Sequence, residues 1–349
     1  MTDIAFPEPQ KNFNGGFFEI VSMASYLPPT QKSTAGLLAD NGLTLKDTII
    51  IRSTGVAQRH IADTADADSD VLAKAARACL SMADTSVNDL SRIFVNKLLG
   101  DRILPPTSAM MQRKLNALTA VQCMDIDGGA NAFLQSLLMA CRCLDAGDDT
   151  ILIASGGVHQ RLMNAQDSRT GYLFGDAGTA LLLRRSDTKH LLAQYEFSNH
   201  SLGHLHHAVD FYHFIDSYLR GGALNLFEME NIREADAYYQ QAAKHTMNTL
   251  LDSAKCVKDD IDMFFVTQMN LPLWQSIVMH LNLPGDKLIS VLPHTGNTFS
   301  ANIPLQLIEW QNEMQHRSPS QGLTALSGKK IMIISLGEGF LGGGCIYQF

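Results

Sequence analysis

Short apolar runs alternate with amphipathic stretches along the first half of the chain. Four runs have the length and apolar character of buried strands, at residues 93–98, 120–126, 150–154 and 179–183. Residues 69–82 and 131–144 instead carry apolar side chains at helical spacing. Because strands alternate with helices, the pattern predicts β-α-β crossovers and a mostly parallel sheet.

The second half of the chain repeats this alternation. Helical spacing is found at residues 235–254, 273–281 and 303–315, and strand-like runs are found at residues 263–267, 288–291, 330–335 and 344–349. Two similar αβ halves packed into one body would explain the repeat without a linker. We place a loose polar extension at residues 1–16, one half at 17–187 and the other at 188–349.

Composition excludes some classes of partner. The 349 residues are 46% hydrophobic and 18% charged, which is enough apolar material for a large core. The net charge of −8 and the lack of a basic stripe argue against a nucleic-acid partner. No apolar stretch has the length of a membrane span, so we expect no membrane partner.

The cysteines and the first residues favour a cytoplasmic protein. Six cysteines lie in apolar surroundings without zinc-ligand spacing, which predicts reduced, mostly buried thiols. The start of the sequence lacks a charged region followed by an apolar run, so we expect no signal peptide.

Five separated stretches carry a family resemblance. They are residues 25–28 (Ser-Tyr-Leu-Pro), 54–62, 173–180 (Leu-Phe-Gly-Asp-Ala-Gly-Thr-Ala), 296–304 and 337–344. In this order and spacing they resemble the β-ketoacyl-acyl-carrier-protein synthase III proteins of the thiolase superfamily. The resemblance implies an α/β thiolase fold, in which two pseudo-repeated αβ halves form α-β-α-β-α layers. It also implies acyl-CoA or acyl-carrier-protein thioesters as substrates, no separate cofactor, and a homodimer.

The nucleophile position of this family falls on Ala130, between a predicted strand and a predicted helix. In the family, a cysteine at this elbow accepts the acyl group, and the helix N-terminus favours its thiolate. The resemblance assigns the oxyanion hole to backbone N–H groups of Ala130 and of the Glu338–Gly339 turn. Ala130 itself performs no covalent chemistry, so we expect this form to be inactive in acyl transfer. Either an introduced Cys→Ala replacement or a naturally noncatalytic subunit explains the alanine.

The other catalytic positions are only partly kept. Thr267 occupies the position of the family's histidine, and Asn297 aligns with its asparagine. Thr267 can donate a hydrogen bond, but it does not titrate near neutral pH as histidine does. His294, three residues before Asn297, is either a displaced base or an ordinary loop histidine.

The resemblance places substrate contacts at Leu104, Phe174, Arg52 and Arg169. Leu104 matches a loop that a partner subunit lends to the acyl pocket, although its Pro-Pro neighbours also suit a plain surface turn. The family's adenine-stacking tryptophan falls at Ile49, and two of its arginines fall at Ser53 and Ser168, beside Arg52 and Arg169. These losses predict weak binding of free coenzyme A and a donor that arrives on a carrier protein.

Two further features have alternative interpretations. Five histidines lie close together in the sequence, at His200, His204, His206, His207 and His213. They lack a carboxylate or thiol set with defined spacing, so we predict a solvated loop or a substrate lining rather than a metal site. Asp176, flanked by small residues, is interpreted as a structural hydrogen-bonding residue.

From the sequence we expect an acyltransferase or condensing enzyme of a specialised biosynthetic pathway. The acyl thioester would then be carried on a cysteine at the position of Ala130. The alternative is a noncatalytic thiolase-fold subunit that works beside an active paralogue.

Overall fold

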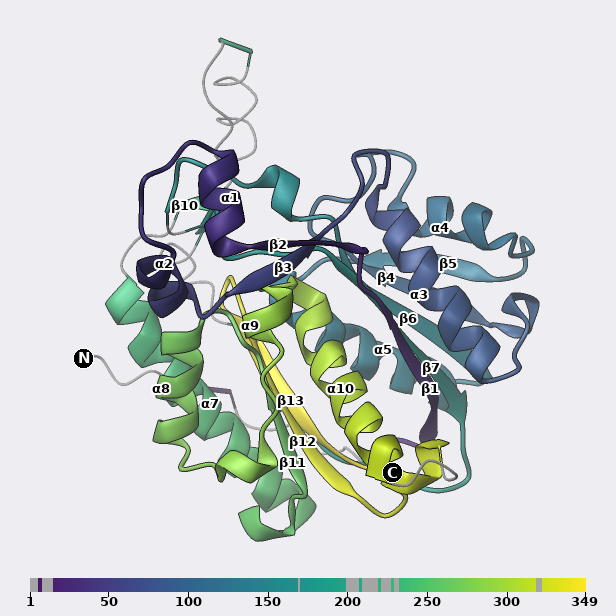
Figure 1. Cartoon of the computed structure of the whole chain (residues 1–349). Helices are drawn as coiled ribbons and strands as arrows, with labels where there is room; N and C mark the ends of the chain where they lie inside the picture. The colour runs from purple at the N-terminus through teal and green to yellow at the C-terminus, as the bar shows by residue number, and fades with distance from the viewer. Residues whose placement is uncertain are drawn as a thin grey trace.

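The structure is a computed structural model that describes residues 6–7, 15–168, 170–198, 207–208, 219–220, 227–228, 232–317 and 322–349. Two large sheets run through the molecule, with helices outside and between them (Figure 1). The first sheet uses strands from the first half of the chain, and the second uses strands that begin at Leu191.

The first sheet has five strands in the order β1-β7-β6-β4-β5. Their bounds are Phe18–Tyr26 for β1, Arg92–Asn96 for β4, Gln122–Ile126 for β5, Thr150–Gly157 for β6 and Ala177–Arg185 for β7. Strands β4, β5 and β6 are parallel, whereas β7 lies antiparallel between β6 and β1. The edge strand β5 leads directly into the elbow at Ala130.

The second sheet has four strands in the order β11-β12-β13-β8. Their bounds are Leu191–Ser198 for β8, Met263–Val266 for β11, Lys330–Gly337 for β12 and Leu341–Gln348 for β13. Only β11 and β12 are parallel; β13 is antiparallel to both of its neighbours.

The predicted mostly parallel sheet is therefore wrong, because both sheets are mixed. Parallel neighbours need a long crossover, and helices supply it from β4 to β5 and from β5 to β6. Between β6 and β7 the described chain forms only the short 3-10 turn Gln160–Leu162, and β7 returns antiparallel.

The predicted strand at residues 288–291 is also wrong. Only Leu288 makes a single bridge, to Phe264, and the short helix α9 (Leu292–Thr295) follows. The buried side chain of Gln268 replaces a neighbouring strand here. Its Oε1 accepts the N–H groups of Val291 and Leu292, and its Nε2 donates to a backbone carbonyl nearby.

Helices form three layers around the sheets (Figure 1). The outer helices of the first sheet are α3 (Asp68–Met82) and α4 (Thr107–Leu115), and those of the second are α7 (Ile232–Ala254) and α8 (Leu271–His280). Between the sheets lie α5 (Ala132–Asp145) and α10 (Asn302–Arg317). Most of α5 is buried, as a helix enclosed on several sides requires.

Smaller elements cover one end of these layers. The strands β2 (Thr30–Ser33) and β3 (Gln58–Ile61) pair antiparallel, next to the helices α1 (Thr34–Asp40) and α2 (Asp47–Thr54). In addition, the two-residue strands β9 (His207–Ala208) and β10 (Phe227–Glu228) pair with each other.

One hydrophobic core joins the two halves. It contains Phe94 and Phe133 from the first half, and Phe265, Ile333 and Tyr347 from the second, all essentially inaccessible to solvent. Apolar burial on this scale is the main favourable contribution to folding. The central helices therefore hold both sheets, and the loops at their ends, in one fixed arrangement.

Candidate active site

The elbow at Ala130 is built as a strand-to-helix turn. Strand β5 ends at Ile126, and a 3-10 turn, Gly129–Asn131, leads into α5. Gly129 has φ of +54°, in the left-handed region that glycine adopts without steric cost, and a Cβ there would collide with the Glu338 carboxyl group. Ala130 is 3% exposed, so its methyl group lies inside the protein at the start of the helix.

The β12–β13 turn packs directly against this elbow. A Cβ on Gly337 would lie only 3.0 Å from both the backbone N and the Cβ of Asn131, so glycine favours this close approach. The next residue, Glu338, accepts a hydrogen bond from the backbone N–H of Ala130 at 3.1 Å. Its carboxylate also accepts a hydrogen bond from its own backbone N–H.

Two N–H groups that the resemblance assigns to an oxyanion hole therefore meet at one carboxylate. The N–H groups of Ala130 and Glu338 do converge, yet both point at the side-chain carboxylate of Glu338. Part of this residue reaches the surface, but protein atoms surround its carboxyl group closely enough that burial raises the pKa above its ordinary value. In this structure the Ala130 N–H is therefore bonded to an acidic side chain of the same chain, and its role as an oxyanion-hole donor stays a prediction.

Thr267 and Asn297 are both buried, at 2% and 4% exposure. The hydroxyl oxygen of Thr267 accepts the backbone N–H of Leu336 at 3.1 Å. The Asn297 amide donates to the carbonyl of Met269 at 3.1 Å and accepts the N–H of Phe299 at 2.9 Å. Both side chains therefore hold backbone segments together. Polar atoms of each side chain are used in these bonds to the backbone and not kept for a substrate.

His294 lies on α9 and is half-buried. Burial lowers the pKa of its imidazole, the nearby Glu309 raises it, and His60 lowers it further. Among the described residues, His294 makes no hydrogen bond to Thr267 or Asn297. The structure thus gives no contact that would make His294 the base for this site.

The predicted substrate-binding residues fall in different places. Phe174 is buried and stacks on Phe299, with ring centroids 4.7 Å apart. Leu104 is 79% exposed in the loop between β4 and α4, and Arg52 is exposed on α2. Arg169 lies outside the described residues.

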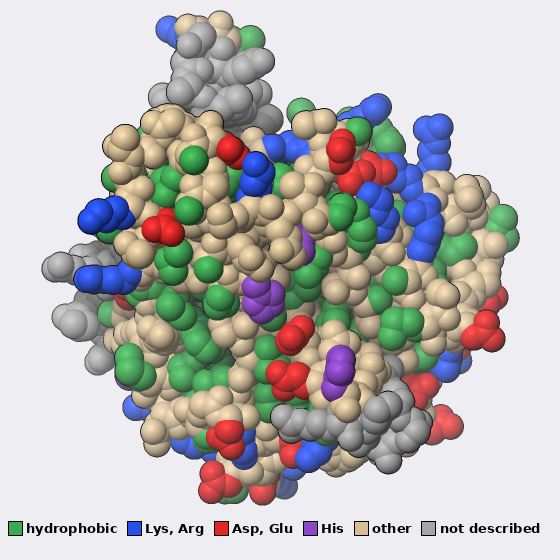
Figure 2. Space-filling model, viewed as in Figure 1, with side chains coloured by type: hydrophobic (Ala, Val, Ile, Leu, Met, Phe, Trp, Pro, Cys, Tyr) green, Lys and Arg blue, Asp and Glu red, His purple; other side chains and the backbone are tan. Residues whose placement is uncertain are grey.

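Two large apolar side chains are exposed on α2 and α8. Ile49, at the position of the missing tryptophan, is 59% exposed, and Met279 on α8 is 73% exposed. Figure 2 shows hydrophobic side chains across the region formed by these helices, with few charges among them. Acidic and basic side chains elsewhere on this face are interspersed.

Two sequence profiles match the chain. One, described as 3-oxoacyl-[acyl-carrier-protein (ACP)] synthase III, matches residues 124–201, and its C-terminal counterpart matches residues 251–349. The chain belongs to the 3-oxoacyl-ACP synthase III family.

Solved structures of synthase III proteins have the same fold. The enzyme of Pseudomonas aeruginosa PAO1 is 23% identical, with a TM-score of 0.81 over 95% of this chain and 98% of that one. The enzyme of Aquifex aeolicus VF5 is 22% identical, with a TM-score of 0.83 over 95% and 100%. The priming β-ketosynthase of the R1128 polyketide pathway is 20% identical, with a TM-score of 0.81 over 99% of both chains.

Asp176 has the structural role that the sequence predicts. It is 1% exposed and accepts the backbone N–H groups of Ala62, His159 and Gln160 at 2.7–2.8 Å. It thereby joins three separate segments of the synthase III fold. Of the predicted histidine group, only His207 falls on a described segment, β9; the other four lie outside the described residues.

Sequence reasoning missed the side chain of Glu338, which entered the prediction only as a backbone N–H donor. The available signal was an acidic residue inside a glycine-rich turn, between Gly337 and Gly339. A carboxylate at such a turn needs hydrogen-bond donors, and the nearest free ones belong to the elbow. Within the part of the chain that the structure describes, no helix is long and apolar enough to cross a membrane.

Proposed function

We propose that this chain is a noncatalytic member of the synthase III family, a thiolase-fold subunit that works beside an active paralogue. The observation that carries the proposal is the hydrogen bond from the Ala130 N–H to the Glu338 carboxylate. An acyl-enzyme needs these N–H groups for the developing oxyanion, and here an acidic side chain of the same chain takes them.

Three departures in one site support this proposal. Ala130 supplies no nucleophile, Thr267 does not titrate near neutral pH, and Glu338 fills the oxyanion hole. An introduced Cys→Ala replacement would explain only the first departure. A subunit that has no acyl transfer to perform would explain all three together.

The carboxylate of Glu338 would also hinder a cysteine at position 130. A thiolate there would lie close to a second negative charge, and like charges at short range disfavour ionisation of both groups. The pKa of such a thiol would rise, opposite to what a nucleophile at a helix N-terminus requires. Replacing Ala130 alone is therefore expected to leave the site inactive.

The second candidate is an acyltransferase whose working form carries cysteine at position 130. The strand, turn and helix start around Ala130 are intact, which favours this candidate. Acyl-CoA or acyl-carrier-protein thioesters would be its substrates, in a specialised fatty-acid or polyketide pathway. One of the structurally similar proteins, OleA of Xanthomonas campestris, was solved with bound lauroyl-CoA.

Intact-protein mass spectrometry separates the two candidates. The present protein, Ala130→Cys, and the double variant Ala130→Cys/Glu338→Gly would each be incubated with acyl-CoA and acyl-carrier-protein donors. We expect no acyl-sized mass gain in the first two proteins. Stoichiometric acylation of Ala130→Cys alone would overturn the noncatalytic proposal and establish the acyltransferase.

The double variant tests the reason for inactivity. Acylation that appears only after Glu338 is also replaced would show that its carboxylate blocks the oxyanion hole. The predicted active paralogue is tested separately, by affinity purification of the tagged chain from its native cells. Recovery of a second thiolase-fold chain with a cysteine at the elbow is the expected result.

A further inference from the structure

Phe6 and Pro7, near the start of the chain, lie against the second half of the molecule. The ring of Phe6 stacks on His245 of α7, with centroids 4.7 Å apart, and meets Phe197 of β8 edge-on at 5.4 Å. The carbonyl of Pro7 accepts a hydrogen bond from the hydroxyl of Tyr195 at 2.9 Å. These aromatic contacts and this hydrogen bond together hold the two residues at one place on α7 and β8.

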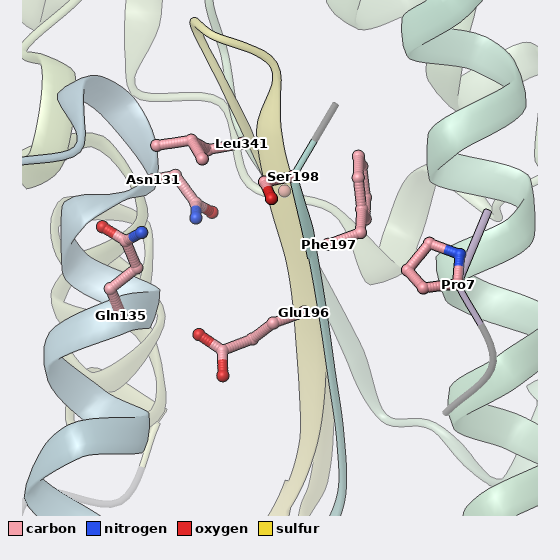
Figure 3. A pocket seen from close by; sticks show the side chains of 8 residues that line it. Pro7, Asn131, Gln135, Glu196, Phe197, Ser198 and Leu341 are labelled. Carbon is pink, nitrogen blue, oxygen red and sulfur yellow. The ribbon is translucent and has the colours of Figure 1, made fainter. Parts of the chain in front are cut away.

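Figure 3 shows where these residues lie relative to the elbow. Pro7 and Phe197 are on one face of β8, whereas Glu196 points from the other face toward α5. All three line the same cavity, together with Asn131 of the elbow. Because β8 and β13 lie between Pro7 and the elbow, any influence of one on the other has to pass through neighbouring elements.

Two tyrosines of α7 connect Phe6 with the turn between β12 and β13. Phe6 stacks on Tyr238 at 5.9 Å, and Tyr238 packs on Phe340 with centroids 4.5 Å apart. The neighbouring Tyr239 meets Phe340 edge-on at 4.7 Å, and its hydroxyl donates to the carbonyl of Gly337 at 3.4 Å. Both tyrosines and Phe340 are essentially inaccessible to solvent, so this connection runs through the interior.

These contacts hold the turn on both sides of Glu338. The carbonyl of Gly337 is bonded immediately before it, and the ring of Phe340 is packed two residues after it. The carboxylate of Glu338 accepts the Ala130 N–H at 3.1 Å, so a small shift of the turn would lengthen or break this bond. Closely packed interiors transmit such shifts, because they contain little empty space to absorb them.

We propose that Phe6 is a positioning residue, which acts through the α7 tyrosines to hold the turn that carries Glu338 on the elbow. Pro7 supports this role, because proline restricts the backbone conformations of the residue before it. The inference rests on the same Ala130–Glu338 hydrogen bond as the proposed function, but it requires no statement about acyl transfer. Removing the Phe6 ring should therefore loosen this hydrogen bond and leave the rest of the fold unchanged.

Hydrogen exchange at two alanine amides tests the proposal. In protein labelled only at its alanine amides, NMR follows Ala130, whose N–H is bonded to Glu338. It also follows Ala62, whose N–H is bonded to Asp176 and serves as the internal control. Phe6→Ala is expected to speed exchange at Ala130 by about three- to tenfold and to leave Ala62 unchanged. Equal exchange at Ala130 in both proteins overturns the proposal.

Two further variants separate positioning from general destabilisation. Phe6→Tyr keeps the ring and should restore the original exchange at Ala130. Phe17→Ala removes a 40% exposed ring from the same end of the chain and should not alter this exchange. Parallel acceleration at Ala130 and Ala62 in Phe6→Ala would show that the whole fold is loosened, which contradicts a positioning role.

The same measurement distinguishes this inference from the proposed function. Unprotected exchange of Ala130 in the original protein would mean that the bond to Glu338 does not form, and would remove the basis of both. Protection of Ala130 that persists in Phe6→Ala would overturn only the positioning role and would leave the proposed function standing.

Discussion

The backbone N–H of Ala130 and the carboxylate of Glu338 are separated by 208 residues in the chain and by 3.1 Å in space. The first belongs to the 3-10 turn that leads into α5, and the second belongs to a turn between two strands of the other sheet. Glycine at positions 129 and 337 favours this close approach, because an added Cβ would lie 2.3 Å from the Glu338 carboxyl group at the first position and 3.0 Å from Asn131 at the second. The contact between these two groups is therefore a property of how the halves pack.

The stability of the protein should fall as pH rises through the titration of Glu338. Burial raises the pKa of this carboxyl in the folded state, so the folded protein binds its proton more tightly than the unfolded chain. The favourable contribution is complete below the ordinary value of 4.5 and is lost as pH rises through the raised pKa. Glu338→Gln should lack this loss.

Thermal melts of both proteins between acidic and mildly alkaline pH measure this effect. The melting temperature of Glu338→Gln, relative to the original protein, should increase as pH rises. Glu313→Gln, at an exposed position of α10, is the control and should show a pH-independent difference. A constant difference for Glu338→Gln as well would show that its carboxyl does not titrate differently on folding.

Thr267→Val should destabilise the protein although the two side chains have nearly the same shape. The Leu336 N–H would lose its acceptor while remaining buried, at a cost of about 1–3 kcal/mol. Thr267→Ser keeps the hydroxyl and should recover much of this loss. The midpoint of urea unfolding measures both variants, and equal midpoints for Val and Ser would contradict a structural role for the hydroxyl.

Local patterns predicted the five longest helices and the central strands closely, but gave no range for the shorter helices α1, α2 and α4 or for the strands β1 and β8. The helix predicted at 69–82 is observed as Asp68–Met82, and the strand predicted at 263–267 as Met263–Val266. These elements bury one face or both, so apolar spacing alone marks them. The elbow could be predicted from the sequence equally well, because a strand, two glycines and an amphipathic helix follow one another around Ala130.

Contacts between segments far apart in the sequence could not be predicted from these local patterns. The antiparallel direction of β7 follows from its pairing with β6 and β1, and the backbone N–H of Val291 is bonded by the side chain of Gln268 instead of by a strand. Glu338 likewise finds its donor in the other half of the chain. Each outcome depends on which segments meet in space, and the spacing of apolar residues carries no information about that.

Asp176→Asn should destabilise the protein more than a surface change of the same kind. The native carboxylate accepts three buried backbone N–H groups, and the amide would direct its NH₂ toward at least one of them. Charge-assisted hydrogen bonds of this type contribute about 1.5–3 kcal/mol each, so we expect a loss of about 2–3 kcal/mol in urea unfolding. Asp187→Asn, which is exposed, should stay within about 0.5 kcal/mol.

We propose that the loop at Leu104 contributes to association of two chains, and Leu104→Asp should then weaken this association without affecting the fold of one chain. Leu104 is 79% exposed beside the equally open Ile103, so an acidic side chain there would meet water in the isolated chain and would be disfavoured against an apolar partner surface. We expect unfolding to change by no more than about 0.5 kcal/mol and the dissociation constant to rise at least about tenfold. Sedimentation velocity across a concentration series measures association, with Met279→Asp on α8 as the matched control. If both variants associate like the original protein, this loop is a plain surface turn.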